Sequence, residues 1–301
     1  MSFSIRRHHA VVRAAVAAVV AASVLALTPR TDAAAKSFGW KINGGQTVIY
    51  LVGSVHMLSQ DYYPLSPALE SAYKASDLLV EEADLGEMLA PDAQMQFLMS
   101  SMLPANQSLD QLVSPSTLAL VTKHIEATGM PFEPLKRFKP WALALTLMAM
   151  EWQRAGFDAE LGLDKHFYDL AQSDGKKVQG LETVEYQISR FDGMTRDQQD
   201  RMLAETLKGF DTEMANVSKL ADAWKAGDAP AVERVVLQDL RQDPQMYQRL
   251  LVERNRNWLP KLEALFTRRS QALVVVGAAH LVGPDGLLAL LKARGFAVEQ
   301  L

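Results

Sequence analysis

The chain has 301 residues, of which 49% are hydrophobic and 22% charged, and this composition is ordinary for a globular protein. Its formal charge is −4, but residues 1–35 carry four arginines and one aspartate, so residues 36–301 have a formal charge of −7. No basic tract with interleaved aromatic residues follows residue 35, so we expect no nucleic-acid partner. The absence of cysteine excludes a disulfide framework, a thiolate metal site and a thiol nucleophile.

The first 35 residues have the pattern of a signal peptide. Three arginines precede an apolar run over residues 14–27, and Ala33-Ala34-Ala35 supplies a small-x-small cleavage pattern. The run is shorter than the ~20 residues of a membrane-spanning helix, so cleavage is favoured over an uncleaved anchor. We therefore expect a periplasmic or secreted protein that begins near residue 36, has no membrane span, and is exported by the general secretion route rather than the twin-arginine route.

Residues 36–301 predict a single α/β domain. Alternating or continuous apolar segments bounded by turn residues predict strands, in chain order at residues 38–42, 47–52, 78–82, 177–179, 272–276 and 296–301. A largely helical insertion is expected over roughly residues 86–270, interrupted by the strand at 177–179. Within it, Met95, Leu98, Met99 and Met102 recur at helical spacing, which predicts a stripe that packs in the core rather than a metal or cofactor site.

Two segments far apart in the sequence repeat one unit. Residues 51–56 and 275–280 are both an apolar strand that runs into G-x-x-H, and a helix and a strand are expected after each. This echo predicts a central mixed sheet built from two pseudo-equivalent halves. Ligands bind at the carboxyl ends of parallel strands, so we expect His56 and His280 to meet at one edge of the sheet in a shared site.

Carboxylates close two of the predicted strands. Glu81 and Glu82 end the strand at 78–82, and Glu182 follows the strand at 177–179. A buried carboxylate needs a cation or histidine partner, whereas a carboxylate that caps a strand in solvent needs none. Because strand side chains alternate, we expect one of the Glu81–Glu82 pair to point into the site and the other away.

The remaining polar candidates lie on predicted helices. Arg254 and Asn255 could bind a substrate carboxylate or stabilise an oxyanion, although their residue types alone favour a solvent-facing helix. His124 and His166 have plain helical surroundings, so we expect structural roles for them. The sequence contains neither H-E-x-x-H nor G-x-S-x-G, which disfavours ordinary zincins and α/β-hydrolases.

Taken together, these motifs resemble the TraB/GumN family over nearly all of residues 40–301. The resemblance rests on the two G-x-x-H segments, on Leu79–Asp84, Gly162–Asp164, Gly180–Thr183 and Glu253–Asn255, and above all on Val276–Gly283. The family belongs with the Tiki metalloproteases and is more distantly similar to erythromycin-esterase-like and ChaN-like proteins. The resemblance implies that His56, Glu82 and His280 are metal ligands, and that Glu82, Glu182, Arg254 and Asn255 act in catalysis, with Glu81 as the alternative to Glu82.

The first hypothesis is therefore an exported metal-dependent hydrolase, such as a peptidase, that acts on a peptide or small-molecule substrate. Imidazole and carboxylate ligands suit a divalent transition metal such as zinc, manganese or cobalt. One alternative is a metal-free, esterase-like hydrolase in which a histidine is the general base and Arg254 stabilises charge. The other alternative is a binding protein without catalytic activity, for a peptide or a haem-like ligand.

Overall fold

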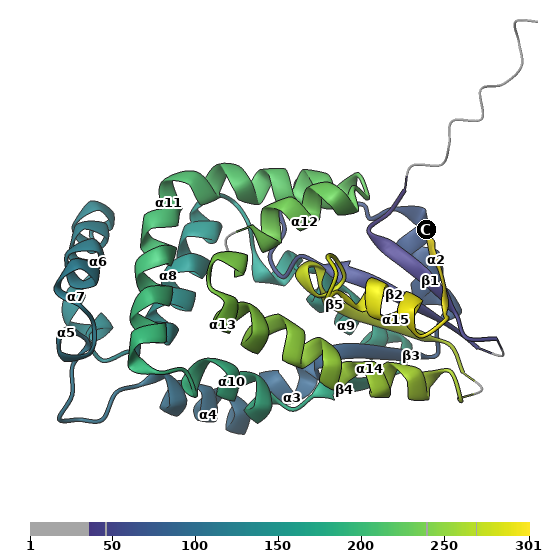
Figure 1. The fold of residues 1–301 in the computed structure, drawn as a ribbon, viewed down its shortest axis with the longest axis horizontal. Helices are drawn as coiled ribbons and strands as arrows, with labels where there is room; N and C mark the ends of the chain where they lie inside the picture. Colours follow the sequence, from purple (N-terminus) through teal and green to yellow (C-terminus); the bar gives the residue numbers. More distant parts are fainter. Residues whose placement is uncertain (1–35, 46, 239, 269) are drawn as a thin grey trace, which may run out of the picture. The chain divides into compact units, whose positions relative to one another are not determined.

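The computed structural model in Figure 1 describes residues 36–301 apart from residues 46, 239 and 269, and it describes only the backbone of residues 211–216. The predicted signal peptide lies outside the described residues. Residues 36–301 form one compact unit. The strands of its sheet are β1 (Gly39–Asn43), β2 (Val48–Ser54), β3 (Leu78–Ala83), β4 (Lys177–Glu182), β5 (Ala272–Gly277) and β6 (Ala297–Gln300).

The strands form one sheet in the order β4-β3-β5-β2-β1-β6. The first four run parallel to one another, whereas β1 is antiparallel to both β2 and β6. The expected α/β fold with a mixed sheet is therefore confirmed. All four parallel strands are longer than expected, because ladder pairing continues past the apolar residues, for example from Ser54 to Gly277 and from Ala83 to Glu182.

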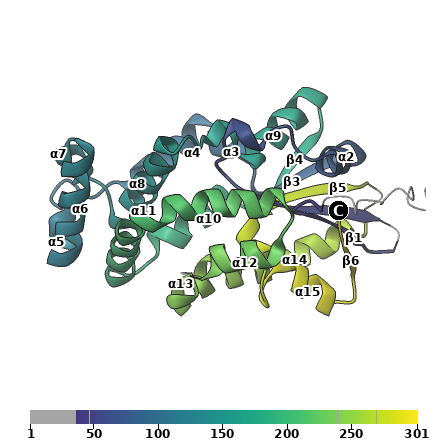
Figure 2. The same ribbon diagram turned by 90° about the horizontal axis from the view of Figure 1, so that it is seen from above.

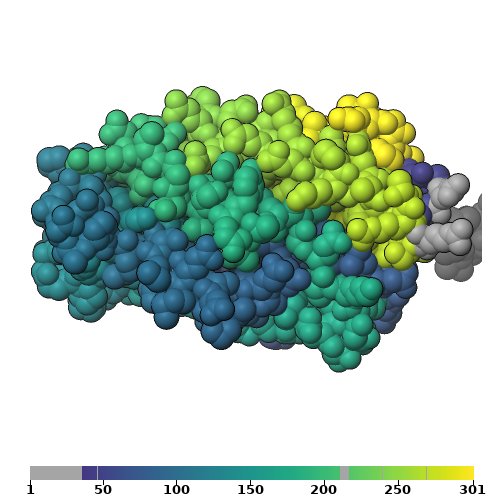
Figure 3. Space-filling model, turned by 90° about the horizontal axis from the view of Figure 1, so that it is seen from below, coloured from purple at the N-terminus to yellow at the C-terminus, as the bar shows by residue number. Residues whose placement is uncertain are grey.

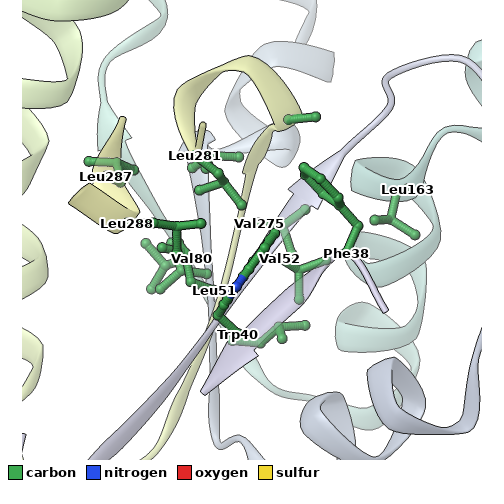
Figure 4. Packing of buried hydrophobic residues seen from close by; sticks show 14 of the residues in the cluster. Phe38, Trp40, Leu51, Val52, Val80, Leu163, Val275, Leu281, Leu287 and Leu288 are labelled. Carbon is green, nitrogen blue, oxygen red and sulfur yellow. The ribbon is translucent and has the colours of Figure 1, made fainter. Parts of the chain in front are cut away.

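Helices cover both faces of the sheet. In Figure 2, α2 (Pro67–Ala75) and α9 (Leu163–Asp174) lie on one side of the strands, and α14 (Glu253–Leu265) and α15 (Leu287–Ala293) lie on the other. A sheet that is covered on both faces favours continuous apolar strands. Accordingly, every residue of β5 is buried, and Val80, Val275 and Leu51 pack with Phe38 and Leu281 in the core shown in Figure 4.

The expected internal echo has a topological consequence. After β2 the chain passes through α2 to β3, and after β5 it passes through α15 to β6, so the two connections leave the central pair of strands in opposite directions. The boundary between β2 and β5 is thus a switch point, and ligands bind at such points in parallel α/β sheets. Both G-x-x-H motifs follow these two strands.

The predicted insertion is largely helical and is interrupted by β4. Its first part contains α3 (Leu85–Leu89), α4 (Pro91–Ser101), α5 (Leu109–Leu112), α6 (Pro115–Thr128), α7 (Phe132–Leu135), α8 (Pro140–Arg154) and α9, and its second part contains α10 (Val184–Asp192), α11 (Arg196–Lys225), α12 (Ala229–Leu237), α13 (Pro244–Tyr247) and α14. A π-helical turn, Gln248–Val252, joins α13 to α14. A second apolar cluster, separate from the sheet, contains Leu109, Val121, Leu147 and Leu203.

The prediction that the methionine stripe packs in the core is wrong. In α4, Met95 is 56% exposed, Leu98 48% and Met99 71%, while Met102 is half-buried. The helix packs through another side, where Ala93 joins a small cluster and the Phe97 ring contacts Trp141 edge-on. Helical periodicity identifies an apolar face, but it does not say whether another element covers that face.

The helix α11 runs without a break over 30 residues. The last helix, α15, begins at Leu287. Among the described residues, no helix combines the length and the apolar character that crossing a membrane requires.

Candidate active site

His56 and His280 meet at the switch point of the sheet, as expected. Ser54 at the end of β2 pairs with Gly277 at the end of β5, so the two motifs leave the sheet side by side, and His280 ends a 3₁₀ turn, Ala278–His280. A Cβ placed on Gly277 would lie 3.1 Å from His56 Nε2, 3.1 Å from Glu82 Oε1 and 3.6 Å from His280 Cδ2. The two imidazoles and one carboxylate therefore surround a single point above Gly277.

His280 is buried and is held at both ring nitrogens. Its Nδ1 donates to Asn255 Oδ1 at 2.7 Å, and its Nε2 lies 3.0 Å from Arg254 Nη1, which donates to it. Arginine cannot accept a hydrogen bond, so this pattern fixes the neutral tautomer with its proton on Nδ1. Burial lowers the pKa of His280 to about 3, and the Arg254 charge acts in the same direction.

His56 lies nearer to the surface, with 62% of its side chain exposed. Its Nδ1 donates to Asp164 Oδ2 at 2.8 Å, and the same carboxylate oxygen accepts a short hydrogen bond from Ser54. The Asp164 carboxylate raises the pKa of His56 to about 9, and Glu82 acts in the same direction. Asp164 thus orients the ring so that Nε2 is directed toward Glu82.

Arg254 connects the two strand-end glutamates that were expected in the site. Its Nη2 donates to Glu82 Oε2 and, at 2.7 Å, to Glu182 Oε1. Burial alone would raise the pKa of Glu82, but Arg254 and the two histidines together hold it well below its usual range. The interpretation of Arg254 and Asn255 as solvent-facing is wrong, because they are only 8% and 0% exposed.

Glu82 rather than Glu81 lies beside the histidines. Glu82 Oε1 accepts from the Gly277 backbone N–H at 2.6 Å and lies 3.8 Å from His280 Nε2. Glu81 is also buried, so the reading in which both carboxylates cap the strand in solvent is wrong. Glu81 Oε2 accepts from the Leu85 backbone N–H, while its Oε1 has no hydrogen-bond partner among the described residues.

A cavity of about 380 Å³ opens onto this cluster. Its lining includes the polar residues His56, Glu81, Glu82 and Asp164, together with Ala83 and apolar side chains of α3. A larger hollow of about 560 Å³ lies where α2 and α9 lead into β3 and β4, at the opposite edge of the sheet. The smaller cavity is the candidate active site, because it alone adjoins the convergent histidines and carboxylates.

Two residues of the site were not predicted as members of it. Asp164, at the start of α9, holds His56, and only the Gly162–Asp164 motif gave a signal for it. Trp258 donates from Nε1 to Glu182 Oε2 at 2.9 Å, and its ring lies 4.4 Å from the His280 ring. Its spacing of one helical turn from Arg254 was the available signal, because residues four apart share a helix face.

His124 and His166 lie away from this cavity. His124, on α6, contacts the Phe210 ring at 4.8 Å, and His166, on α9, lies between Tyr63 and Phe167. Neither residue lines the cavity. Their positions agree with packing roles.

The three proposed metal ligands fit a divalent transition metal in donor chemistry. Each imidazole is fixed at Nδ1 by a side-chain oxygen, which leaves Nε2 as the ligating atom, and such outer partners typically orient metal-binding histidines. The side chains of the described residues, as they stand, form no group of three or more that could hold an ion. In addition, Arg254 Nη1 occupies the lone pair of His280 Nε2, which must be released before that nitrogen can bind a metal.

This fold and motif set define a recognised class. The family model described as the TraB/PrgY/gumN family matches residues 38–300, and the chain belongs to this family. Two similar proteins carry the name uncharacterized protein YbaP. The one from Escherichia coli strain K12 is 28% identical over 248 residues, covering 82% of this chain and 89% of its own length, and the one from Shigella flexneri is 28% identical, covering 81% and 87%. No solved structure matches the chain.

Proposed function

We propose that the protein is an exported, metal-dependent hydrolase that acts on a carbonyl or related electrophile in a peptide or small molecule. The observation that carries this proposal is the convergence above Gly277 of His56 Nε2, Glu82 Oε1 and the His280 ring. Two fixed imidazoles and one carboxylate are a common ligand set of hydrolytic metal sites.

His56, Glu82 and His280 would hold the ion. A divalent metal would supply Lewis-acid polarisation of the substrate and a more acidic water as nucleophile. Asp164 and Asn255 hold the two rings in the ligating tautomer. Arg254, Glu182 and Trp258 act as positioning residues, because together they fix the Glu82 carboxylate and the His280 ring.

Glu81 would assist from the cavity side. Glu81 is one of the residues that line the cavity, and its buried Oε1 has no hydrogen-bond partner among the described residues, so this oxygen would accept a hydrogen bond from a water molecule or from a substrate N–H group that reaches it. A buried carboxylate oxygen without a partner costs free energy, and such cases are often functional. We therefore assign ion binding to the Glu82 carboxylate and orientation of a water molecule to the Glu81 carboxylate.

Elemental analysis of residues 36–301, purified without affinity-tag metals, tests this proposal. We expect close to one equivalent of zinc, manganese or cobalt in the wild-type protein, and loss of the metal in His56→Ala and Glu82→Gln. His124→Gln is the matched control, since it replaces a histidine outside the cavity, and it should keep its metal. Hydrolysis of a peptide or ester library that persists in strong chelator would refute metal dependence.

A second candidate is a metal-free hydrolase in which His56 is the general base, in its neutral form above the pKa of about 9 that Asp164 gives the ring. The contact of Arg254 Nη1 with His280 Nε2 favours it, because in this arrangement the imidazole is not free to bind a metal. The His56–Asp164 pair resembles the base and orienting group of hydrolytic triads. The sequence suggested that Arg254 stabilises charge on the substrate in such a hydrolase. This role is disfavoured, because all three nitrogens of the guanidinium donate to protein groups. A protein that binds a peptide or haem tightly but hydrolyses nothing would contradict both candidates.

A further inference from the structure

One side of the candidate active-site cavity is apolar. Ala83, Leu85, Met88 and Leu89 line it, and all four come from the end of β3 and from α3. The reactive groups His56 and Glu82 belong to the same lining. A ligand that fills the cavity therefore meets both polar groups and hydrocarbon.

The apolar side continues outside the cavity. Leu89 lines the cavity and is also 47% exposed, and only Ala90 separates it from α4. The exposed stripe of α4, formed by Met95, Leu98 and Met99, begins one turn after the start of that helix. In Figure 3, α3 and α4 (blue) lie together on the face shown. Every large apolar side chain that is strongly exposed among the described residues lies within residues 89–99. Exposed apolar patches of this kind mark binding surfaces.

The charges around the cavity disfavour an anionic ligand. Lys165 is the one lysine or arginine among the described residues that line it, and it is paired with Asp169 at 2.6 Å and with Glu160 at 3.5 Å. Arg254 is fully engaged with the protein, and His56 is paired with Asp164. A free fatty acid or a phosphate group would therefore find no unpaired cationic side chain here and would have only the proposed ion as a positive partner, whereas a neutral molecule would not require such a partner.

The apolar side also favours a hydrocarbon chain over a polypeptide. It is formed by helices, whose backbone N–H and C=O groups are already hydrogen-bonded, so it offers no ladder to the backbone of a bound peptide. Methionine side chains adapt to apolar ligands of different shape. Resting on the proposed hydrolytic function, we infer that the substrate is a neutral acyl ester or acyl amide whose chain lies against α3 and along the Met95–Leu98–Met99 stripe.

The reaction that follows is ordinary hydrolysis. Water adds to the acyl carbon, the bond from that carbon to the leaving oxygen or nitrogen breaks, and the leaving group takes up a proton. The products are a carboxylic acid and an alcohol or amine. A product carboxylate would meet Glu82 and Glu160 around the cavity, and repulsion by these groups would favour its release.

Binding of straight-chain methyl ketones to residues 36–301 tests the inference without requiring turnover, because a ketone reproduces the acyl carbonyl and has no leaving group. Calorimetric titration from 2-butanone to 2-dodecanone should show affinity rising about threefold to fourfold for each methylene that is buried. Replacing Met95, Leu98 and Met99 together by glutamine should remove the gain for the longest chains and leave the shortest ketones unchanged. The matched control is Gln94→Ala with Gln96→Ala, two exposed positions on the same helix, and it should keep the gain.

Each outcome separates the inference from the proposed function. If affinity rises with chain length in the wild-type protein and this rise is lost in the stripe variant, the inference is supported. If, in addition, no ester is hydrolysed with or without added manganese, only the proposed function fails. Affinity that does not depend on chain length overturns the inference. Tighter binding of a blocked leucine-rich peptide than of 2-dodecanone would also overturn it and would assign the stripe to polypeptides. The stripe variant should fold, because substitutions at exposed positions usually change stability by under about 0.5 kcal/mol.

Discussion

Replacing Arg254 by methionine should destabilise the protein severely. The guanidinium donates to Glu82, Glu182 and His280, and the side chains of the three charged residues are at most 10% exposed. Methionine keeps much of the side-chain volume but leaves two carboxylates buried next to each other without a cation. Breaking a buried ion pair by removing one partner costs about 3–5 kcal/mol, and here one arginine serves two carboxylates.

We therefore expect a loss of about 4–5 kcal/mol in the free energy of unfolding, which is a large fraction of the roughly 5–15 kcal/mol that stabilises a typical protein. In a unit of this size each kcal/mol lowers the melting temperature by about 2–4 °C, so a fall of about 10 °C or more should accompany it. Urea unfolding of residues 36–301, followed by circular dichroism in the presence of chelator, measures the change without compensation by a bound metal.

Two further variants make the result decisive. Neutralising both acids as well, in Arg254→Met with Glu82→Gln and Glu182→Gln, should restore most of the lost stability, because the buried charge is then gone. Arg154→Met removes a surface pair with Glu151 at 2.9 Å and should cost less than about 1 kcal/mol. A cost below about 1 kcal/mol for Arg254→Met, or no recovery in the triple variant, would refute the buried-charge argument.

Three further predictions concern the site, export and pH. His56→Ala and His280→Ala should each abolish hydrolysis, and the double variant should be hardly worse, because residues that act as a unit are not additive; independent additive losses would argue against a shared site. N-terminal sequencing of the exported protein should begin near Lys36, and an intact N-terminus would remove the export proposal. Burial lowers the pKa of His124, so the unfolded state binds more protons below pH ~6.5, and stability should fall as the pH drops below this value. His124→Gln should weaken that dependence in urea titrations at pH 7.5 and 5.5.

The sheet and the edge that carries the site could be predicted because their signals are local. Runs such as Leu78–Val80 and Ala272–Val276 are apolar throughout, as strands buried on both faces must be. The repeated G-x-x-H step then fixed both histidines at the same end of their strands. Strand ends were less predictable, since the ladder between β3 and β4 continues past the apolar residues to Ala83 and Glu182.

The contacts within the site depended on long-range packing, which residue types alone do not reveal. Asp164 reaches His56 across 108 residues of sequence, and Arg254 reaches Glu82 across 172. The partners of Arg254 are distant in the sequence, and the residues next to it are those of an ordinary polar helix. Its side chain was therefore not expected to be buried. The prediction for the methionine stripe failed for the opposite reason: its pattern suited the core, but no helix among the described residues covers it.

The π-helical turn at Gln248–Val252 makes the rotational position of α14 sensitive to a one-residue deletion. A π turn holds one more residue than an α-helical turn, so it behaves as a single-residue insertion within an otherwise regular helix. Deleting one residue there would restore regular winding and turn everything downstream by about 100° about the helix axis. Arg254, Asn255 and Trp258 would then rotate out of the cluster together, although no contact residue had been altered. The length of this short segment, more than the identity of its residues, therefore sets the alignment of three side chains in the site.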